Sequence, residues 1–242
     1  MKILKVRRVV AVLGALAAVV AWLIVNPAST ETIFTRAESN DAAGIESEGV
    51  PLAAEVLDKL EVKGRAPKTG YSREEFYNGW PTVEGCNLRQ RIIRREFGGT
   101  AVLDECTVVA GEYEEPYTGE YRKYTDKAEI AKLQIDHVVA LSDEWQKGAQ
   151  YMAYVVRHAI ATDPLNLLAV DGTANQKKSD GDAATWLPPN KKFRCQYVAR
   201  QVSVKYKYGL WVTEAEKDAI VTVLASCPRE PAVGVEELVL GG

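Results

Sequence analysis

The sequence predicts an α+β fold with one folded domain over residues 61–228. Residues 106–121 alternate in polarity and are rich in Val, Tyr and Thr, which is typical of antiparallel strands. Two further short apolar runs, residues 132–141 and 166–172, also predict strands. Each of them precedes a segment with helical spacing. A chain of 242 residues with 47% hydrophobic residues is long enough to bury one core.

Helix boundaries in the first half of this domain are marked by turn and capping residues. We expect a helix around 87–97, ended by Gly98 and Gly99, because glycine commonly follows a helix C-terminus. After the strand at 132–141, Ser142 is the expected N-cap of a helical segment that extends to about residue 160.

The second half should be mainly helical. A helix is expected to start near Thr173 and to be stopped by Pro188, and a long helix should follow over 191–208. Thr213 and Glu216 have the spacing of a capping box, which predicts a last helix ending near Cys227.

The N-terminus indicates export. Four basic residues precede an uncharged stretch from Val9 to Val25, so residues 1–25 are predicted to be a signal peptide or a membrane anchor. The stretch lacks a clear cleavage site and has the minimum length of a spanning helix, so both alternatives stay open. Either one places the rest of the chain outside the cytoplasm, secreted or anchored on the outer face of the cytoplasmic membrane through residues 9–25.

Charge is distributed unevenly along the chain. Residues 26–60 contain seven acidic and two basic residues with little apolar periodicity, so we expect a flexible acidic linker there, and residues 229–242 are predicted to be a peripheral C-terminal tail. Residues 171–210 contain eight basic and three acidic residues, which suits binding of a polyanion. The alternative is an ordinary solvated helix face.

The cysteines predict disulfides. Cys86, Cys106, Cys195 and Cys227 contain no C-x-x-C pair, so zinc binding is disfavoured and extracytoplasmic disulfides are favoured. Of the three possible connectivities we prefer Cys86–Cys106 with Cys195–Cys227, because each closes a short loop within one half of the domain.

Only His137 and His158 are available as catalytic histidines. His158 lies in a helical segment without acidic or amide neighbours at ligand spacing, so we expect a packing or surface role for it. His137 directly follows Asp136 within an apolar strand, where two ionisable groups cost free energy unless they have partners.

The residues around His137 resemble a known family. The segments IDHVVAL (135–141), DPLNLLAV (163–170) and TANQKKSDGD (173–182) resemble the HNH, or ββα-metal, nucleases. Together with GCNLRQ, PYTG, WLPP and the C-terminal cysteines, they are similar to extracytoplasmic relatives of the C-terminal domain of GmrSD-type restriction endonucleases, over about residues 71–227. The resemblance implies a ββα-metal core embedded in additional helices.

The resemblance also implies residue roles. His137 would be the general base that activates water, Asp136 and Asn175 would hold one divalent ion, and Asn166 would hold the loop and orient the His137 ring. Two oxygen ligands favour Mg²⁺ or Mn²⁺ over zinc.

Three basic residues are candidate contacts to substrate phosphates. Lys177 and Lys178 lie near the start of the predicted helix, and Arg89 is a further candidate for which a structural role is an equal alternative.

The expected function is hydrolysis of DNA phosphodiester bonds with little sequence specificity, since no sequence-reading module is recognisable. A ribonuclease, or a nuclease acting on both polymers, is an alternative. A catalytically silent surface protein that binds nucleic acid is another, but its signature would be loss of Asp136, His137 or Asn175, and all three are present.

Overall fold

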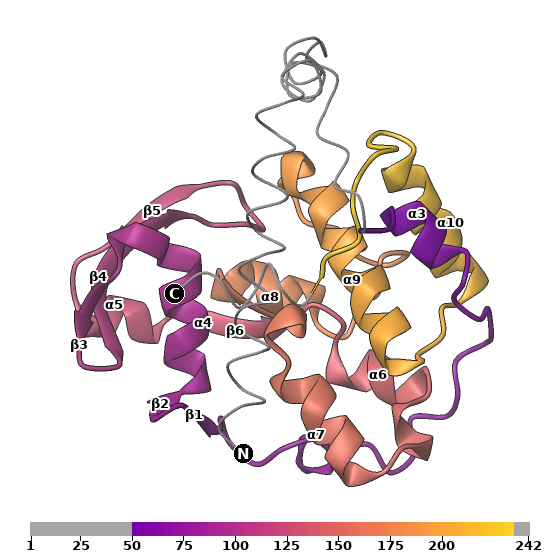
Figure 1. Ribbon diagram of the computed structural model, residues 1–242, viewed down its shortest axis with the longest axis horizontal. Coiled ribbons are helices and arrows are strands. Elements are labelled where there is room, and N and C mark those ends of the chain that lie inside the picture. The colour runs from indigo at the N-terminus through magenta and orange to yellow at the C-terminus, as the bar shows by residue number, and fades with distance from the viewer. Residues whose placement is uncertain (1–49, 235–242) are drawn as a thin grey trace, which may run out of the picture. The chain divides into compact units, whose positions relative to one another are not determined.

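The computed structural model describes residues 50–234, which form an α+β fold, as the sequence predicts (Figure 1). The helices are α3 (Ala53–Leu57), α4 (Leu88–Phe97), α5 (Lys127–Ala131), α6 (Leu141–Gln146), α7 (Tyr154–Thr162), α8 (Gly172–Lys178), α9 (Arg194–Tyr208) and α10 (Glu214–Leu224). The strands are β1 (Thr82–Val83), β2 (Cys86–Asn87), β3 (Val102–Asp104), β4 (Thr107–Glu114), β5 (Tyr121–Tyr124), β6 (Gln134–His137) and β7 (Leu167–Val170).

The strands form small antiparallel sheets. Strand β4 pairs with both β3 and β5, β1 pairs with β2, and β6 pairs with β7, so that His137 lies opposite Leu167. In Figure 1, α8 and β6 lie between the β3–β5 sheet with α4 on one side and α9 on the other. The β6–β7 ribbon is therefore at the centre of the domain.

Strand β7 is buried on both faces. Leu168 and Val170 pack into a core with α3, α9 and α10, whereas Leu167 and Ala169 pack into a second core with α4 and β4. Because successive strand residues point to opposite faces, one apolar strand separates two cores. This explains why the run is continuously apolar instead of alternating.

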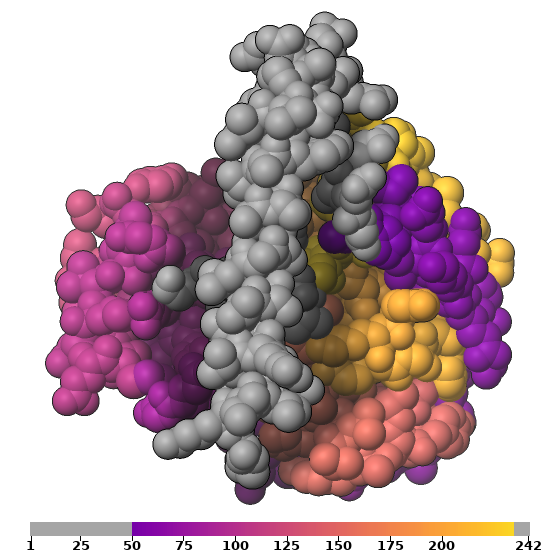
Figure 2. All heavy atoms as spheres, in the orientation of Figure 1, coloured from indigo at the N-terminus to yellow at the C-terminus, as the bar shows by residue number. Residues whose placement is uncertain are grey.

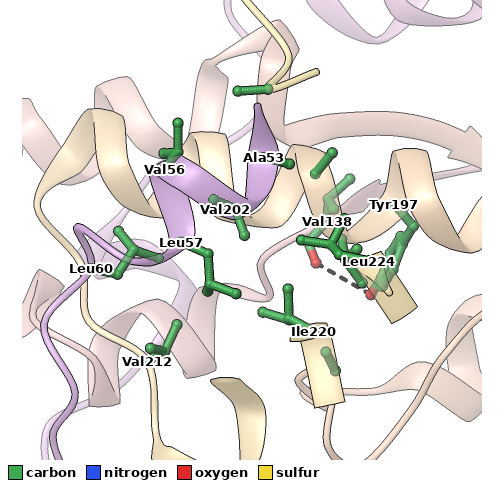
Figure 3. Packing of buried hydrophobic residues seen from close by; sticks show 14 of the residues in the cluster. Ala53, Val56, Leu57, Leu60, Val138, Tyr197, Val202, Val212, Ile220 and Leu224 are labelled. Carbon is green, nitrogen blue, oxygen red and sulfur yellow. Dashed lines mark hydrogen bonds between the residues drawn. The ribbon is translucent and has the colours of Figure 1, made fainter. Parts of the chain in front are cut away.

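The folded part begins before residue 61, so the predicted boundary of the linker is corrected. In helix α3, Ala53, Val56 and Leu57 are buried against Val202 and Ile220 of α9 and α10 (Figure 3). The spacing of these three residues gives the short helix one apolar face. The acidic composition of residues 26–60 hid this face in the sequence. Figure 2 shows this segment, in indigo, against the yellow C-terminal part of the chain.

The start of the predicted tail is also folded. Pro231 forms a bridge to Leu52, and Ala232 is buried in the same core as α3. Residues 229–234 are thus part of the domain, because they pair with the segment that leads into α3.

Several predicted helix boundaries are confirmed. Asn87 caps α4, and Gly98 ends it with a φ of 53°. The capping box of Thr213 and Glu216 begins α10, and α9 follows a single 3-10 turn at Lys191–Phe193.

Two other helix predictions were wrong. Helix α6 starts one residue before Ser142, with Ala140 at the N-cap, and α7 is a separate helix. Helix α8 ends at Lys178, far before Pro188, and the φ of 53° at its C-cap Ser179 is left-handed. Gly148, with a φ of 126°, stands in the turn between α6 and α7 where a continuous helix had been expected.

Both predicted disulfides are present. Cys86 is bonded to Cys106, which ties β2 to the β3–β4 turn, and Cys195 in α9 is bonded to Cys227 after α10. The predicted signal peptide or anchor lies outside the described residues. None of the helices within residues 50–234 has the length and hydropathy that a bilayer span requires.

A buried network of charges joins the helices around the ribbon. The ammonium of Lys147 lies 2.7 Å from Asp143, 2.9 Å from Asp182 and 2.6 Å from Glu216. Lys205 contacts Asp143 and Glu216, and Arg65 contacts Asp143 and Asp182. Three cations thus balance three carboxylates, which satisfies charges that are costly to bury alone.

Candidate active site

The β6–β7 ribbon and α8 bring three of the predicted site residues to one cleft of about 350 Å³. Asp136 and His137 line it from β6, and Asn175 lines it from α8. His137 is the last residue of β6, so Asp136 and His137 both line the cleft at the point where the strand ends.

The His137 ring is buried and held in one orientation. Its Nε2 lies 2.9 Å from the carbonyl oxygen of Ala161, and Trp80 stacks on the ring with centroids 5.8 Å apart and 17° between the planes. Tyr77 packs on the same ring at 5.7 Å. A carbonyl oxygen only accepts, so Nε2 carries the proton and Nδ1 retains its lone pair.

Burial makes this imidazole neutral. Removal from water lowers the pKa of His137 to about 3, since the charged form loses its hydration. The Ala161 carbonyl opposes this shift, and the positive charges of Arg73 and Lys178 add to it. At neutral pH the ring is therefore uncharged, with its lone pair on Nδ1.

The Asp136 carboxylate is also buried and accepts two hydrogen bonds. The Lys178 ammonium lies 3.0 Å from Oδ1, and the Tyr117 hydroxyl donates to Oδ2. Burial raises the pKa of Asp136, whereas Lys178 and Tyr117 act in the opposite direction because they stabilise the anion.

The oxygen atoms of Asp136 and Asn175 are suitable ligands for a divalent cation. Each carboxylate oxygen has two lone pairs, so one remains on each oxygen of Asp136 after the bonds to Lys178 and Tyr117. The Nδ2 of Asn175 donates to Gln134 Oε1 at 2.9 Å, and its Oδ1 accepts no hydrogen bond from any residue within 50–234. Asp136 and Asn175, which both line the cleft, thus have oxygen atoms with unused lone pairs, and oxygen is the ligand that a hard cation prefers.

Asn166 is buried and holds the loop after β6. Its Oδ1 accepts from the backbone N–H of Val139 at 2.9 Å, and its Nδ2 donates to Glu144 Oε1 at 2.7 Å. The predicted loop-holding contact is therefore present. The expectation that Asn166 orients the His137 ring was wrong, because the ring donates its hydrogen bond to the carbonyl oxygen of Ala161.

Of the predicted phosphate contacts, only Lys177 is exposed. Lys178 is 2% exposed and donates to Asp136 and to the His137 carbonyl oxygen, so its assignment to substrate is corrected. It lies one helical turn after buried Ala174, and this i, i+4 spacing directs both inward.

Arg89 has the structural role that the sequence left as an equal alternative to a substrate contact. Its guanidinium donates to the carbonyl oxygens of Ile130 and Leu133, at 3.2 and 2.9 Å. Ile130 is in the last turn of α5 and Leu133 lies just after it, where a helix leaves acceptors without intrahelical partners.

Arg73, Tyr77 and Trp80 were missed in the sequence. Arg73 lines the cleft, is exposed, and has no ion pair within residues 50–234, while Tyr77 and Trp80 enclose His137. The available signal was the aromatic and basic segment YSREEFYNGW before the first disulfide. Nothing in its spacing relates it to a histidine about sixty residues later.

The fold and this cleft together describe an α+β domain with a buried neutral histidine beside a carboxylate. The chain belongs to the family described as "GmrSD restriction endonucleases, C-terminal domain", whose model matches residues 90–223. This family of nuclease domains confirms the resemblance found in the sequence.

A protein of Arthroderma benhamiae described as "Uncharacterized secreted protein" is 35% identical over 178 residues, which cover 72% of this chain and 84% of that protein. No solved structure matches the chain significantly.

Proposed function

We propose that this protein is an exported, metal-dependent endonuclease that hydrolyses DNA phosphodiester bonds with little sequence specificity. The observation that carries the proposal is the buried ring of His137, a residue that lines the cleft, with Nε2 bonded to Ala161 and the lone pair left on Nδ1. Family membership supports the reaction class, because a restriction endonuclease domain acts on nucleic acid.

In the proposed reaction a water molecule attacks the phosphorus atom while its proton passes to Nδ1 of His137. The bond between phosphorus and the departing oxygen then breaks, and that oxygen takes a proton from solvent. Trp80, Tyr77 and the Ala161 carbonyl keep the ring in place, so little ordering is needed during the reaction. The negative charge of the phosphate stabilises the imidazolium that forms next to it.

Asp136 and Asn175 are the proposed ligands of Mg²⁺ or Mn²⁺. When bound, such an ion supplies electrostatic stabilisation of negative charge on the departing oxygen. Lys178 keeps the Asp136 carboxylate fixed by its ion pair at 3.0 Å and by a second bond to the His137 carbonyl oxygen at 2.8 Å. The same lysine therefore sets the relative positions of the proposed ligand and base.

Arg73 is the proposed contact to the scissile phosphate. It lines the cleft with Asp136 and His137, and within residues 50–234 its guanidinium has no ion pair and donates to the Tyr77 hydroxyl. An exposed guanidinium at this position can donate two hydrogen bonds to one phosphate.

Export follows from the predicted signal peptide or anchor and agrees with two other observations. Both disulfides within residues 50–234 suit an oxidising compartment. The similar protein of Arthroderma benhamiae is described as secreted.

The proposal is tested by incubating the purified protein with supercoiled plasmid in Mg²⁺, in Mn²⁺ and in excess chelator. We expect nicking that depends on the metal. A parallel assay with single-stranded RNA separates a DNA enzyme from a ribonuclease. Absence of cleavage of either polymer in Mg²⁺ and Mn²⁺ would refute the proposed function.

A further inference from the structure

Three hollows of the surface are connected along α8. The cleft shares Gln134 and Gln176 with a second hollow of about 520 Å³, and it shares Lys68 and Asp180 with a third of about 490 Å³. The second hollow reaches the start of α8, and the third lies at its end. The catalytic cleft is thus the middle of a longer depression.

The length of the depression suits a polymer. Helix α8 has seven residues and is therefore about 10 Å long. That equals the rise of roughly three nucleotides along one strand of a duplex. Because the outer hollows include residues beyond both helix ends, such as Lys123 and Thr185, the depression extends past this length in both directions.

Each part of the depression contains a cation without a carboxylate partner, and of these Arg73 also donates to the Tyr77 hydroxyl. Lys132 in the second hollow, Arg73 in the cleft and Lys177 in the third are exposed and have no ion pair within residues 50–234. Lys123 lines the same hollow as Lys132, and its side chain is 72% exposed. The nearest carboxylate contact of its ammonium, to Glu112, is long, at 4.0 Å.

The other cations of the depression already have partners. Arg122 contacts Asp171 at 2.7 Å, Lys68 contacts Asp180 at 2.9 Å, Arg65 contacts Asp182 at 2.7 Å, and buried Lys178 contacts Asp136. The unpaired charges are therefore spaced along α8, one or more to each hollow. A row of separated cations matches the regular phosphates of a nucleic acid backbone.

We propose that a polynucleotide strand lies along α8, with Lys132 and Lys123 binding phosphates on one side of the scissile bond and Lys177 binding a phosphate on the other. This inference rests on the proposed function and adds the path of the substrate to it. A strand held on both sides is cut internally, so free ends are not needed.

The experiment compares two double variants of the full chain that lose the same charge. One is Lys132→Gln with Lys177→Gln in the depression. The control is Lys191→Gln with Lys192→Gln, two exposed lysines outside the three hollows. Substrates are a covalently closed circular single-stranded DNA and bis(4-nitrophenyl) phosphate, a small diester that cannot reach the flanking lysines.

We expect the depression variant to raise KM for the circular DNA at least tenfold and to hydrolyse the small diester within twofold of the wild-type rate. The salt dependence of DNA binding should weaken as well, because each lost phosphate contact lowers the slope of log K against log salt by about 0.7–0.9. The control should show neither effect. The proposed path would be overturned if both variants lost activity on circular DNA equally. It would also be overturned if the depression variant lost as much activity on the small diester as on the DNA.

Binding is measured separately in a His137→Ala background by mobility shift. If the wild type cleaves neither substrate, the proposed function fails, yet this measurement still decides the path. Selective loss of DNA binding with the Lys132 and Lys177 substitutions supports it, and unchanged binding contradicts it. Thermal melting of every variant verifies that the fold is retained.

Discussion

Replacing Lys147 by methionine should lower the free energy of unfolding by about 3–5 kcal/mol. The Lys147 ammonium is fully buried and lies within 3 Å of Asp143, Asp182 and Glu216. Methionine fills a similar volume but leaves three buried carboxylates with only Lys205 and Arg65 as counterions. Removing one partner of a buried ion pair typically costs this amount, because an uncompensated charge remains.

Urea unfolding followed by tryptophan fluorescence measures this effect. The matched control is Lys177→Met, which makes the same chemical change at an exposed lysine without an ion pair within residues 50–234. It should alter stability by no more than about 0.5 kcal/mol. A loss below about 1 kcal/mol for Lys147→Met would show that the network does not stabilise the domain as argued.

Three further predictions concern metal, redox state and pH. Asp136→Ala and Asn175→Ala should each reduce the nicking rate and weaken its dependence on Mg²⁺ concentration, and full activity in excess chelator would contradict the oxygen-ligand site. Intact-mass analysis of the secreted protein should find no free thiol before reduction, and four reactive thiols would exclude the two disulfides. Although burial opposes it, Lys205 and Lys147 lower the pKa of Asp143 to about 2. This stabilisation is therefore complete above about pH 4 and is lost as the pH falls towards 2, so Asp143→Asn should flatten the acid limb of stability against pH.

Local sequence patterns predicted the elements that build the site. The run around Asp136 and His137 is a strand, the run after Asn166 is its partner, and the capping box at Thr213 begins the last helix. These signals are local, since a strand run or a cap needs only a few consecutive residues. The disulfide pairing also followed from chain distance alone.

What the sequence did not predict depends on contacts between distant segments. Lys178 was expected at the surface but is buried, because its partner Asp136 lies 42 positions earlier and offsets the cost of burial. Arg89 binds carbonyl oxygens about forty residues away. Trp80 contacts His137, which lies about sixty residues later. No periodicity or spacing encodes such pairs.

The most direct test of the central claim compares His137→Ala with His158→Ala in a plasmid-nicking time course. His158 is half-buried in α7 and does not line the cleft, so it is a natural control. Loss of the general base should reduce the rate by about 10²–10⁴-fold, with DNA binding retained, whereas His158→Ala should cleave at nearly the wild-type rate. Equal cleavage by the two variants would contradict the assignment of His137 as the base.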